Sequence, residues 1–247
     1  MFEWLGLHKN RAMSLTLSGI SSMATRLLLN ELALAYLAHS GVTVAFESVG
    51  GVDAAKRVAA GESFDVVVLA ADAITKLAAH SAVLAETATP LVNSAVAIAV
   101  RTGTAAPDIT SENALRHAVL AARSVGYSTG PSGGALLALF ARWGIADQVR
   151  ERLVQAPPGV PVGALVARGE VELAFQQLSE LMHLEGVTVI GAMPAPIEIV
   201  TTFSAAVCRT SGQPSEAHKL LAYLASPATA NVKLRHGMQA TTPGASQ

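Results

Sequence analysis

The sequence has few of the features that point to nucleic-acid binding or to a disulfide-stabilised fold. Its single cysteine, Cys208, excludes a disulfide within the chain. Lys and Arg form no run, the formal net charge is −1, and aromatic residues make up only 4% of the chain. Because neither a basic surface nor base-stacking platforms are available, we expect no nucleic-acid partner.

Motifs of metal, nucleotide and nucleophilic chemistry are absent as well. The seven histidines form no HExxH pair and no Cys/His cluster at zinc spacing, so we expect no metal site and no cofactor. No GxSxG turn of a serine hydrolase occurs. The stretch 126–133 is not a Walker loop, because no Gly-Lys-Ser or Gly-Lys-Thr follows it.

Long hydrophobic runs are also missing. No apolar run reaches the roughly 20 residues that span a bilayer, so we expect no membrane insertion. Residues 1–13 have no basic start before an apolar core and no small-residue cleavage site. We interpret them as an N-terminal extension. As written, the chain is predicted to be cytoplasmic, and it would be periplasmic if a signal had been removed.

The sequence does contain much apolar material, divided among short segments. Hydrophobic residues make up 51% of the 247 residues and charged residues 14%, which suits a large core and excludes a disordered chain. Strand-like and helix-like segments alternate, which predicts a doubly wound α/β fold. The predicted strands are 14–18, 42–46, 64–70, 91–100, 124–127, 187–191 and 197–207. The predicted helices are 22–38, 52–60, 71–79, 111–120, 135–144, 148–153, 163–169, 214–225 and 228–234.

Two of these segments are long enough to connect two lobes. Residues 91–100 and 197–207 are both apolar and rich in β-branched side chains, and we interpret them as crossing strands. We therefore assign residues 14–91 and 205–247 to lobe 1 and residues 92–204 to lobe 2. Ligands of such folds bind at the carboxyl ends of strands, beside helix N-termini, which predicts a site in the cleft between the lobes.

Three junctions rich in glycine and serine precede predicted helices. They are SGISS at 18–22, SVGG at 48–51 and STGPSGG at 128–134. The first N–H groups of a helix have no partner within the helix and lie at the positive end of its dipole, so each junction is a candidate anion site. The candidate ligand residues here are Ser18, Ser21, Ser22, Gly50, Gly51, Thr129, Ser132 and Gly133.

Each candidate also has an ordinary structural explanation. Ser21 or Ser22 can act as a helix cap, which is worth about 1 kcal/mol, and two glycines can form a simple turn. Arg26 and Arg101 can supply charge to a ligand, but exposed cations at such positions are more often merely solvated. Asn93, in the first crossing segment, can contact the ligand or satisfy backbone groups of a hinge.

The order of several motifs resembles that of the solute-binding proteins of ABC importers, in particular the molybdate-binding branch. The motifs are SGISS, GESFDVVVLAAD at 61–72, PSG at 131–133, ARGEVELAFQQLSE at 167–180 and IGAMPAP at 190–196. The resemblance covers residues 14–237. It implies two α/β lobes that close over a small anion and, for an exported protein, a partner in the membrane component of an ABC importer.

The resemblance also implies where the ligand binds, and the sequence departs from the molybdate pattern there. It implicates Ser21 or Ser22, the helix start after Gly51, the backbone at Ser132 and Gly133, and the segment from Gln176 through Gln177 to Ser179. However, SVGG has glycines where hydroxyls are expected, and the family's late ligand tyrosine has no equivalent. We therefore expect an organic di- or tricarboxylate, with a molybdate- or sulfate-type oxyanion as the weaker alternative.

Catalysis is the alternative to simple binding. Aconitate isomerases resemble the same branch, so the chain could isomerise a small unsaturated tricarboxylate. Such a reaction needs a group that removes a proton and returns it. Glu180 and His183 lie three residues apart just after the predicted cleft segment, and Glu47 flanks the second glycine turn. Residues of these types are more often surface charges.

Overall fold

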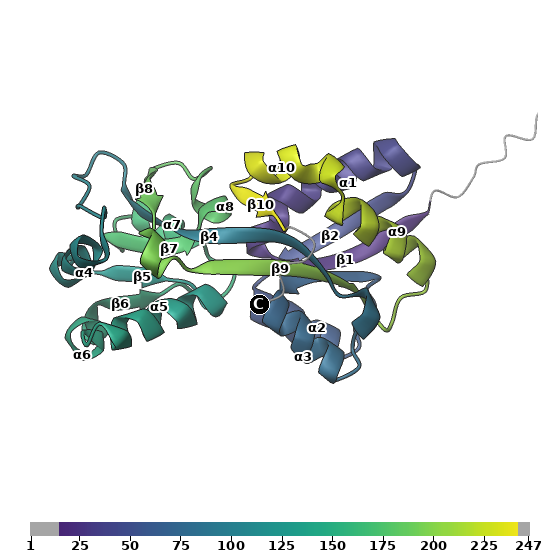
Figure 1. Ribbon diagram of the computed structural model, residues 1–247, viewed down its shortest axis with the longest axis horizontal. Helices are drawn as coiled ribbons and strands as arrows, with labels where there is room; N and C mark the ends of the chain where they lie inside the picture. The colour runs from purple at the N-terminus through teal and green to yellow at the C-terminus, as the bar shows by residue number, and fades with distance from the viewer. Residues whose placement is uncertain (1–14, 242–247) are drawn as a thin grey trace, which may run out of the picture.

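Strand β4 (Thr89–Arg101) connects two lobes of a mixed α/β fold in the computed structural model, which describes residues 15–241. The first half of β4 pairs antiparallel with β9 (Val200–Val207) and β10 (Met238–Ala240). From Val96 onward it pairs antiparallel with β7 (Leu173–Gln177) and β8 (Val187–Ala192). Strand β4 thus belongs to the sheets of both lobes, as expected for one of the crossing strands that the sequence predicts (Figure 1).

The first lobe contains a sheet with helices on both faces. Its strands lie in the order β2, β1, β3, β9, β4, with β1 parallel to β2 and β3. The further strands are β2 (Thr43–Val49), β1 (Thr16–Ser22) and β3 (Val66–Ala70). The helices are α1 (Arg26–Ser40), α2 (Gly51–Ala59), α3 (Ala71–Ala79), α9 (Pro214–Ala225) and α10 (Ala230–Arg235).

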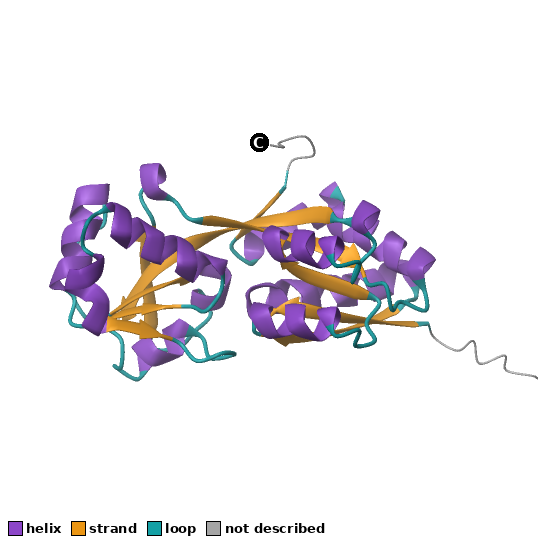
Figure 2. Ribbon diagram, turned by 90° about the horizontal axis from the view of Figure 1, so that it is seen from below, coloured by secondary structure: helices purple, strands orange, loops and turns teal. Residues whose placement is uncertain are grey.

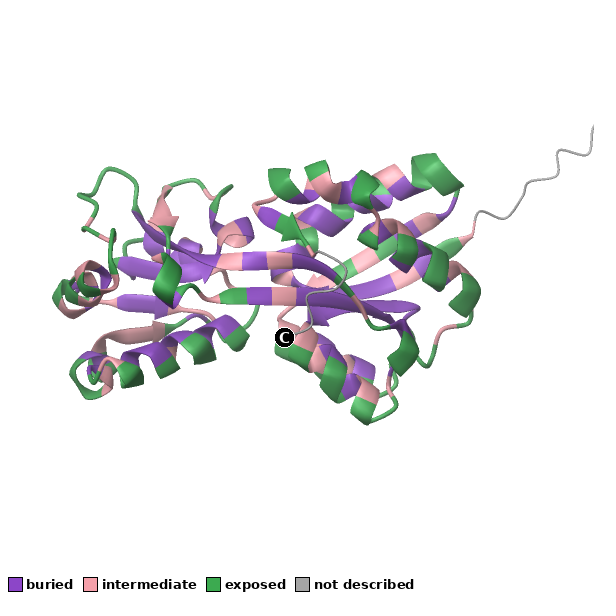
Figure 3. Ribbon diagram, in the orientation of Figure 1, coloured by how far each residue is buried: buried purple, intermediate pink, exposed green. Residues whose placement is uncertain are grey.

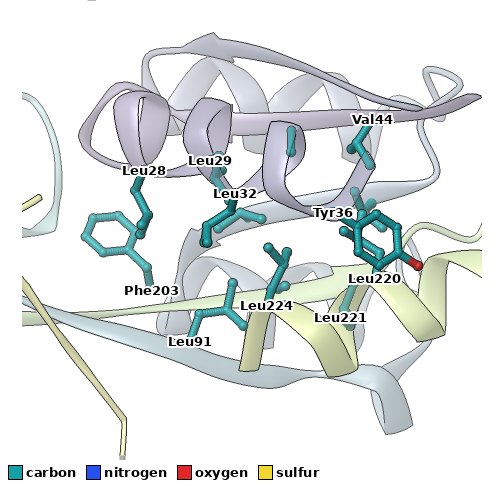
Figure 4. Close-up of a cluster of buried hydrophobic side chains, with 14 of the residues drawn as sticks. Leu28, Leu29, Leu32, Tyr36, Val44, Leu91, Phe203, Leu220, Leu221 and Leu224 are labelled. Atoms are coloured by element: carbon teal, nitrogen blue, oxygen red, sulfur yellow. The ribbon is translucent and has the colours of Figure 1, made fainter. Parts of the chain in front are cut away.

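The alternating side chains of β3 explain why helices cover both faces of this sheet. Val66 and Val68 pack in the cluster beneath α1 and α9, which Figure 4 shows in close-up. Val67 and Leu69 pack in the opposite cluster beneath α2 and α3. Each fully buried side chain of this size contributes about 1.5–3 kcal/mol, so a strand that is apolar on both faces stays between two layers.

The second lobe repeats this arrangement. Strands β5 (Val125–Tyr127) and β6 (Leu153–Gln155) are parallel to each other, and β5 is parallel to β7. Figure 2 shows the helices on both sides of the strands, and Figure 3 shows that β7 is buried whereas β6 and β8 are intermediate or exposed. The helices are α4 (Glu112–Ala121), α5 (Pro131–Arg142), α6 (Ala146–Val149), α7 (Val162–Ala167) and α8 (Leu178–Leu181).

Several local predictions were wrong. The first strand does not end at 18 with SGISS as a junction, because β1 continues through Ser22 by parallel pairing with β2. The predicted helix 148–153 is the end of α6, a 3₁₀ turn and the start of β6. The second crossing strand begins at Val200, because a 3₁₀ turn occupies 195–197. The exact lobe boundaries stay a prediction, and the extension at 1–13 lies outside the described residues.

Lys233 on α10 is a buried cation within the first lobe. It is only 1% exposed, and among residues 15–241 no carboxylate forms an ion pair with it. Burial lowers the pKa of this ammonium group because the charged form loses its hydration. The charged lysine is therefore more stable in the unfolded chain, where it is hydrated and keeps its ordinary pKa.

Lys233→Met is expected to stabilise the protein at pH 7 by about 1–3 kcal/mol, since it removes a buried charge and keeps the length of the side chain. The gain should shrink as the pH rises toward about 10.5, where the unfolded lysine also loses its proton. Urea unfolding at pH 7 and pH 10 measures both effects. Exposed Lys219→Met is the control, and a loss of stability in Lys233→Met at pH 7 would contradict this prediction.

Candidate functional site

A cavity of about 420 Å³ lies between the lobes, at the point where three helices begin. The first lobe contributes the starts of α2 and α3, through Gly51 and Ala70. The second lobe contributes the start of α5, through Pro131 and Ser132. Because these helices follow the carboxyl ends of strands β2, β3 and β5, the site lies at the sheet edge that the sequence predicts.

The three helices begin without side-chain caps. Their N-cap residues, Gly50, Ala70 and Gly130, make no side-chain hydrogen bond to the first turn. N–H groups of the first turns are therefore available to a ligand or to water, and the three dipoles favour negative charge in the cavity. The start of α3 is a site element that we did not predict, because Ala70-Ala71 has none of the glycines and serines that signalled the others.

Two buried polar side chains that line this cavity have unpartnered atoms. Ser22 and Gln177 are 7% and 5% exposed, yet Ser22 Oγ and Gln177 Oε1 have no hydrogen-bond partner within residues 15–241. The other amide atom of Gln177, Nε2, donates to Thr201 Oγ1 over 2.9 Å. An unsatisfied buried polar group costs about 1–3 kcal/mol, so a polar ligand that bonds to these atoms removes the penalty.

Predicted residues Ser22, Gly51, Ser132 and Gln177 line this cavity. Ser21 is not among its lining residues, because its side chain is fully buried and its Oγ shares a hydrogen bond of 2.8 Å with Ser48 Oγ. Gly133 has a packing role, since a Cβ atom there would come within 2.0 Å of the Ser128 carbonyl oxygen. Only glycine allows the turn after β5 to approach α5 this closely.

A second cavity, of about 330 Å³, adjoins the first, and Ser128 lines both. It brings together cationic Arg26 and two titratable residues of the α8 region, Glu180 and His183. The remaining predicted residues on its walls are Gly50, Thr129, Gln176 and Ser179. Ser179 also links the lobes, because its Oγ donates a hydrogen bond of 2.9 Å to the carbonyl oxygen of Ala24.

Glu180 is oriented by Gln176, which uses both ends of its amide. Gln176 Nε2 donates to Glu180 Oε2, and Gln176 Oε1 accepts from the Gly163 N–H over 3.1 Å. Burial raises the pKa of the Glu180 carboxyl, although the Gln176 hydrogen bond and the positive charge of Arg26 act in the opposite direction. The carboxyl therefore titrates above its ordinary range, as a proton-transfer group in a cleft would.

Like Ser21 and Gly133, three further predicted residues line neither cavity. Ser18 is near the amino end of β1, where its N–H and Oγ donate to Asp65. Asn93 accepts a hydrogen bond of 2.8 Å from Thr202 across the crossing strands. Glu47 is held by Arg57, which lowers the pKa of its carboxyl, so it remains a surface charge. The structure does not bring these side chains to the cleft.

Residues 15–241 contain neither a membrane-spanning helix nor a cluster of metal-binding side chains. No helix there is long and apolar enough to cross a membrane. The same residues contain no group of three His, Cys, Asp or Glu side chains placed to hold a metal ion. Among them, the features that converge at the cleft are hydrogen-bond donors, one arginine and titratable side chains.

Two α/β lobes joined by crossing strands, with uncapped helix starts at the cleft, define the class of solute-binding proteins. This chain belongs to the bacterial extracellular solute-binding protein family, whose model matches residues 17–239. The family resemblance drawn from the sequence motifs is thereby confirmed. The description of the family is extracellular, and the location of this chain stays a prediction.

Particular relatives differ in what they are described to do. An aconitate isomerase from a Pseudomonas species is 37% identical over 219 residues, covering 85% of this chain and 82% of that protein. The periplasmic molybdate-binding protein of Azotobacter vinelandii is 17% identical, with a TM-score of 0.75 and coverage of 92% of this chain and 99% of that chain. The sulfate-binding protein of Mycobacterium tuberculosis has the same identity and TM-score, with 93% and 88% covered. The two structures show the fold alone.

Proposed function

We propose that the cleft binds a small organic di- or tricarboxylate. The observation that carries this proposal is the convergence of three uncapped helix starts on one cavity that also contains unpartnered atoms of Ser22 and Gln177. Carboxylate oxygens accept hydrogen bonds from backbone N–H groups and from the Ser22 hydroxyl. The Gln177 amide can also rotate by half a turn, so that its Oε1 accepts from the Thr201 hydroxyl and its NH₂ group donates to the ligand.

The cavity suits an organic anion better than a tetrahedral metal oxyanion. Its volume of about 420 Å³ falls in the range of about 300–1,000 Å³ that organic ligands occupy. Its walls include the apolar side chains of Leu69, Leu77 and Phe203, which favour contact with carbon atoms. Gly51 stands where a hydroxyl would otherwise bind an oxyanion, and it leaves room for a larger ligand.

Calorimetric titration of the folded protein tests this proposal with trans-aconitate, citrate, molybdate and sulfate. We expect a carboxylate to bind at least about tenfold more tightly than either inorganic anion, a difference of about 1.4 kcal/mol. No binding of any carboxylate, or tighter binding of molybdate or sulfate, would overturn it.

Isomerisation is a second candidate, favoured by Glu180 in the adjoining cavity and by the relative described as an aconitate isomerase. The Glu180 carboxylate would take a proton from the CH₂ carbon of an unsaturated tricarboxylate. The C–H electron pair would spread over the allyl system and its carboxylates, whose charge the helix starts stabilise. Return of the proton to the other end of the allyl system would move the double bond, with no net change in atoms or electrons.

Proton NMR in D₂O separates isomerisation from simple binding. An isomerase should interconvert trans- and cis-aconitate and introduce deuterium at the exchanging carbon. Binding without interconversion or exchange would reject the isomerase and leave a solute-binding protein that delivers its ligand to an ABC importer. Catalytic turnover with release of product would instead favour an enzyme that needs no such partner.

A further inference from the structure

Arg26 is a cation without a carboxylate partner at the wall of the second cavity. Several other arginines, such as Arg57, Arg168 and Arg235, form ion pairs with carboxylates. Among residues 15–241, by contrast, no carboxylate lies within ion-pair distance of Arg26. A guanidinium presents a planar array of donors that matches a carboxylate, so an unpaired one in a cleft is suited to an anionic ligand.

The position of Arg26 adds to the positive potential. It is the first residue of α1 and directly follows a 3₁₀ turn, Met23–Thr25, whose last residue provides no side-chain cap. Thr25 Oγ1 instead donates to the carbonyl oxygen of Ser22, next to the first cavity. Arg26 thus adds a full positive charge to a compartment that Gly50, the N-cap residue of α2, also lines.

The two cavities are compartments of one cleft. Ser128 lines both of them. Of the two adjacent residues Gly50 and Gly51, Gly51 lines the first cavity and Gly50 lines the second. A ligand that extends across this boundary can place one end at the starts of α2, α3 and α5 and the other at Arg26. A dicarboxylate held at those starts leaves Arg26 unpaired, whereas a third carboxylate would pair with it.

We propose that Arg26 is a specificity-determining residue that binds the third carboxylate of a tricarboxylate whose other carboxylates lie at the starts of α2, α3 and α5. This inference rests on the proposed function and narrows its substrate class from di- or tricarboxylates to tricarboxylates. Glu180 shares the compartment, and burial raises the pKa of its carboxyl, so its neutral form persists to higher pH and repels a bound carboxylate less.

A matched pair of ligands tests the role of Arg26. Mesaconate has the two carboxylates on the double bond and the double-bond geometry of trans-aconitate, but a methyl group in place of its carboxymethyl arm. Calorimetry should show that the wild-type protein binds trans-aconitate about tenfold or more tightly than mesaconate. In Arg26→Gln this preference should fall to about twofold or less, with the affinity for mesaconate unchanged.

Arg101→Gln is the control, because Arg101 is exposed and lines a different cavity of the second lobe. It should keep the wild-type preference, and thermal unfolding establishes that both variants are folded. Retention of the preference in Arg26→Gln, or its absence in the wild-type protein while mesaconate still binds, would overturn the role of Arg26 alone. Failure of the wild-type protein to bind either ligand would overturn both this inference and the proposed function.

Discussion

Ser132→Asp is expected to weaken carboxylate binding by about 100-fold while the protein remains folded. Ser132 is the second residue of α5 and lines the cavity, so an aspartate there places a negative charge where the ligand's charge should lie. Like charges brought together in an interface cost several kcal/mol, and a 100-fold loss corresponds to about 2.7 kcal/mol. An acidic residue in the first turn of a helix is itself favourable for the helix, which supports folding. Calorimetry with trans-aconitate measures the loss.

The chain offers a matched control for this substitution. Helix α9 also begins with Pro-Ser, and Ser215 holds the same second position but lines neither cavity of the cleft. Ser215→Asp should therefore leave affinity unchanged, and Ser132→Ala, which removes only a hydroxyl, should weaken binding by about tenfold or less. If Ser132→Asp folds and binds as the wild-type protein does, the start of α5 is not part of the ligand site.

Glu180→Gln is expected to lower the kcat of the proposed isomerisation by about 10²–10⁴-fold. Glutamine keeps the size of the side chain and its capacity to accept from Gln176 Nε2, but it cannot carry the proton. Binding of trans-aconitate should therefore persist while exchange of deuterium stops. NMR kinetics measure the rate, and calorimetry establishes that the ligand still binds.

Two further measurements distinguish a proton carrier from a structural residue. In the wild-type protein, kcat/KM should fall as the pH drops through the raised pKa of Glu180, because the base must start without its proton. Glu185→Gln, an exposed change on the same segment, should keep both rate and pH profile. An active Glu180→Gln variant with the wild-type pH profile would remove Glu180 from the mechanism.

The same raised pKa predicts an effect on stability with a definite sign. The folded state holds the Glu180 proton more tightly than the unfolded chain, so stability from this group is present below about pH 4.5 and is lost as the pH rises through the folded pKa. Above the folded pKa of Glu180, the protein bears the cost of a buried carboxylate at this position. The Tm gain of Glu180→Gln should therefore be larger at pH 7 than at pH 4.

Local sequence patterns predicted most of the fold. The apolar run of β3 and the alternation of strands with helices follow from the burial of side chains on two faces, and this pattern is visible in single segments. The boundaries were less predictable, because β1 extends through Ser22 only by pairing with β2. The turn at 195–197 likewise shortens the second crossing strand.

Candidate site residues were identified from the sequence where the chain marks helix starts with small or hydroxylated residues. Ser22, Gly51 and Ser132 were found in this way and line the larger cavity. The start of α3 has no such residues and was missed. Ser18 was included because it shares a motif with Ser22, but along a strand the two lie at different distances from the carboxyl edge.

By itself, the sequence determined the α/β class, the two-lobed arrangement and the uncapped glycine- and serine-rich starts of α2 and α5, since these depend on local composition and periodicity. Only the tertiary structure decided which groups face one another. Arg26 and Glu180 lie 154 positions apart in the chain. They share a cavity because the crossing segments, of which β4 is one, bring the lobes together. Contacts of this kind depend on packing across the cleft, and no local pattern records them.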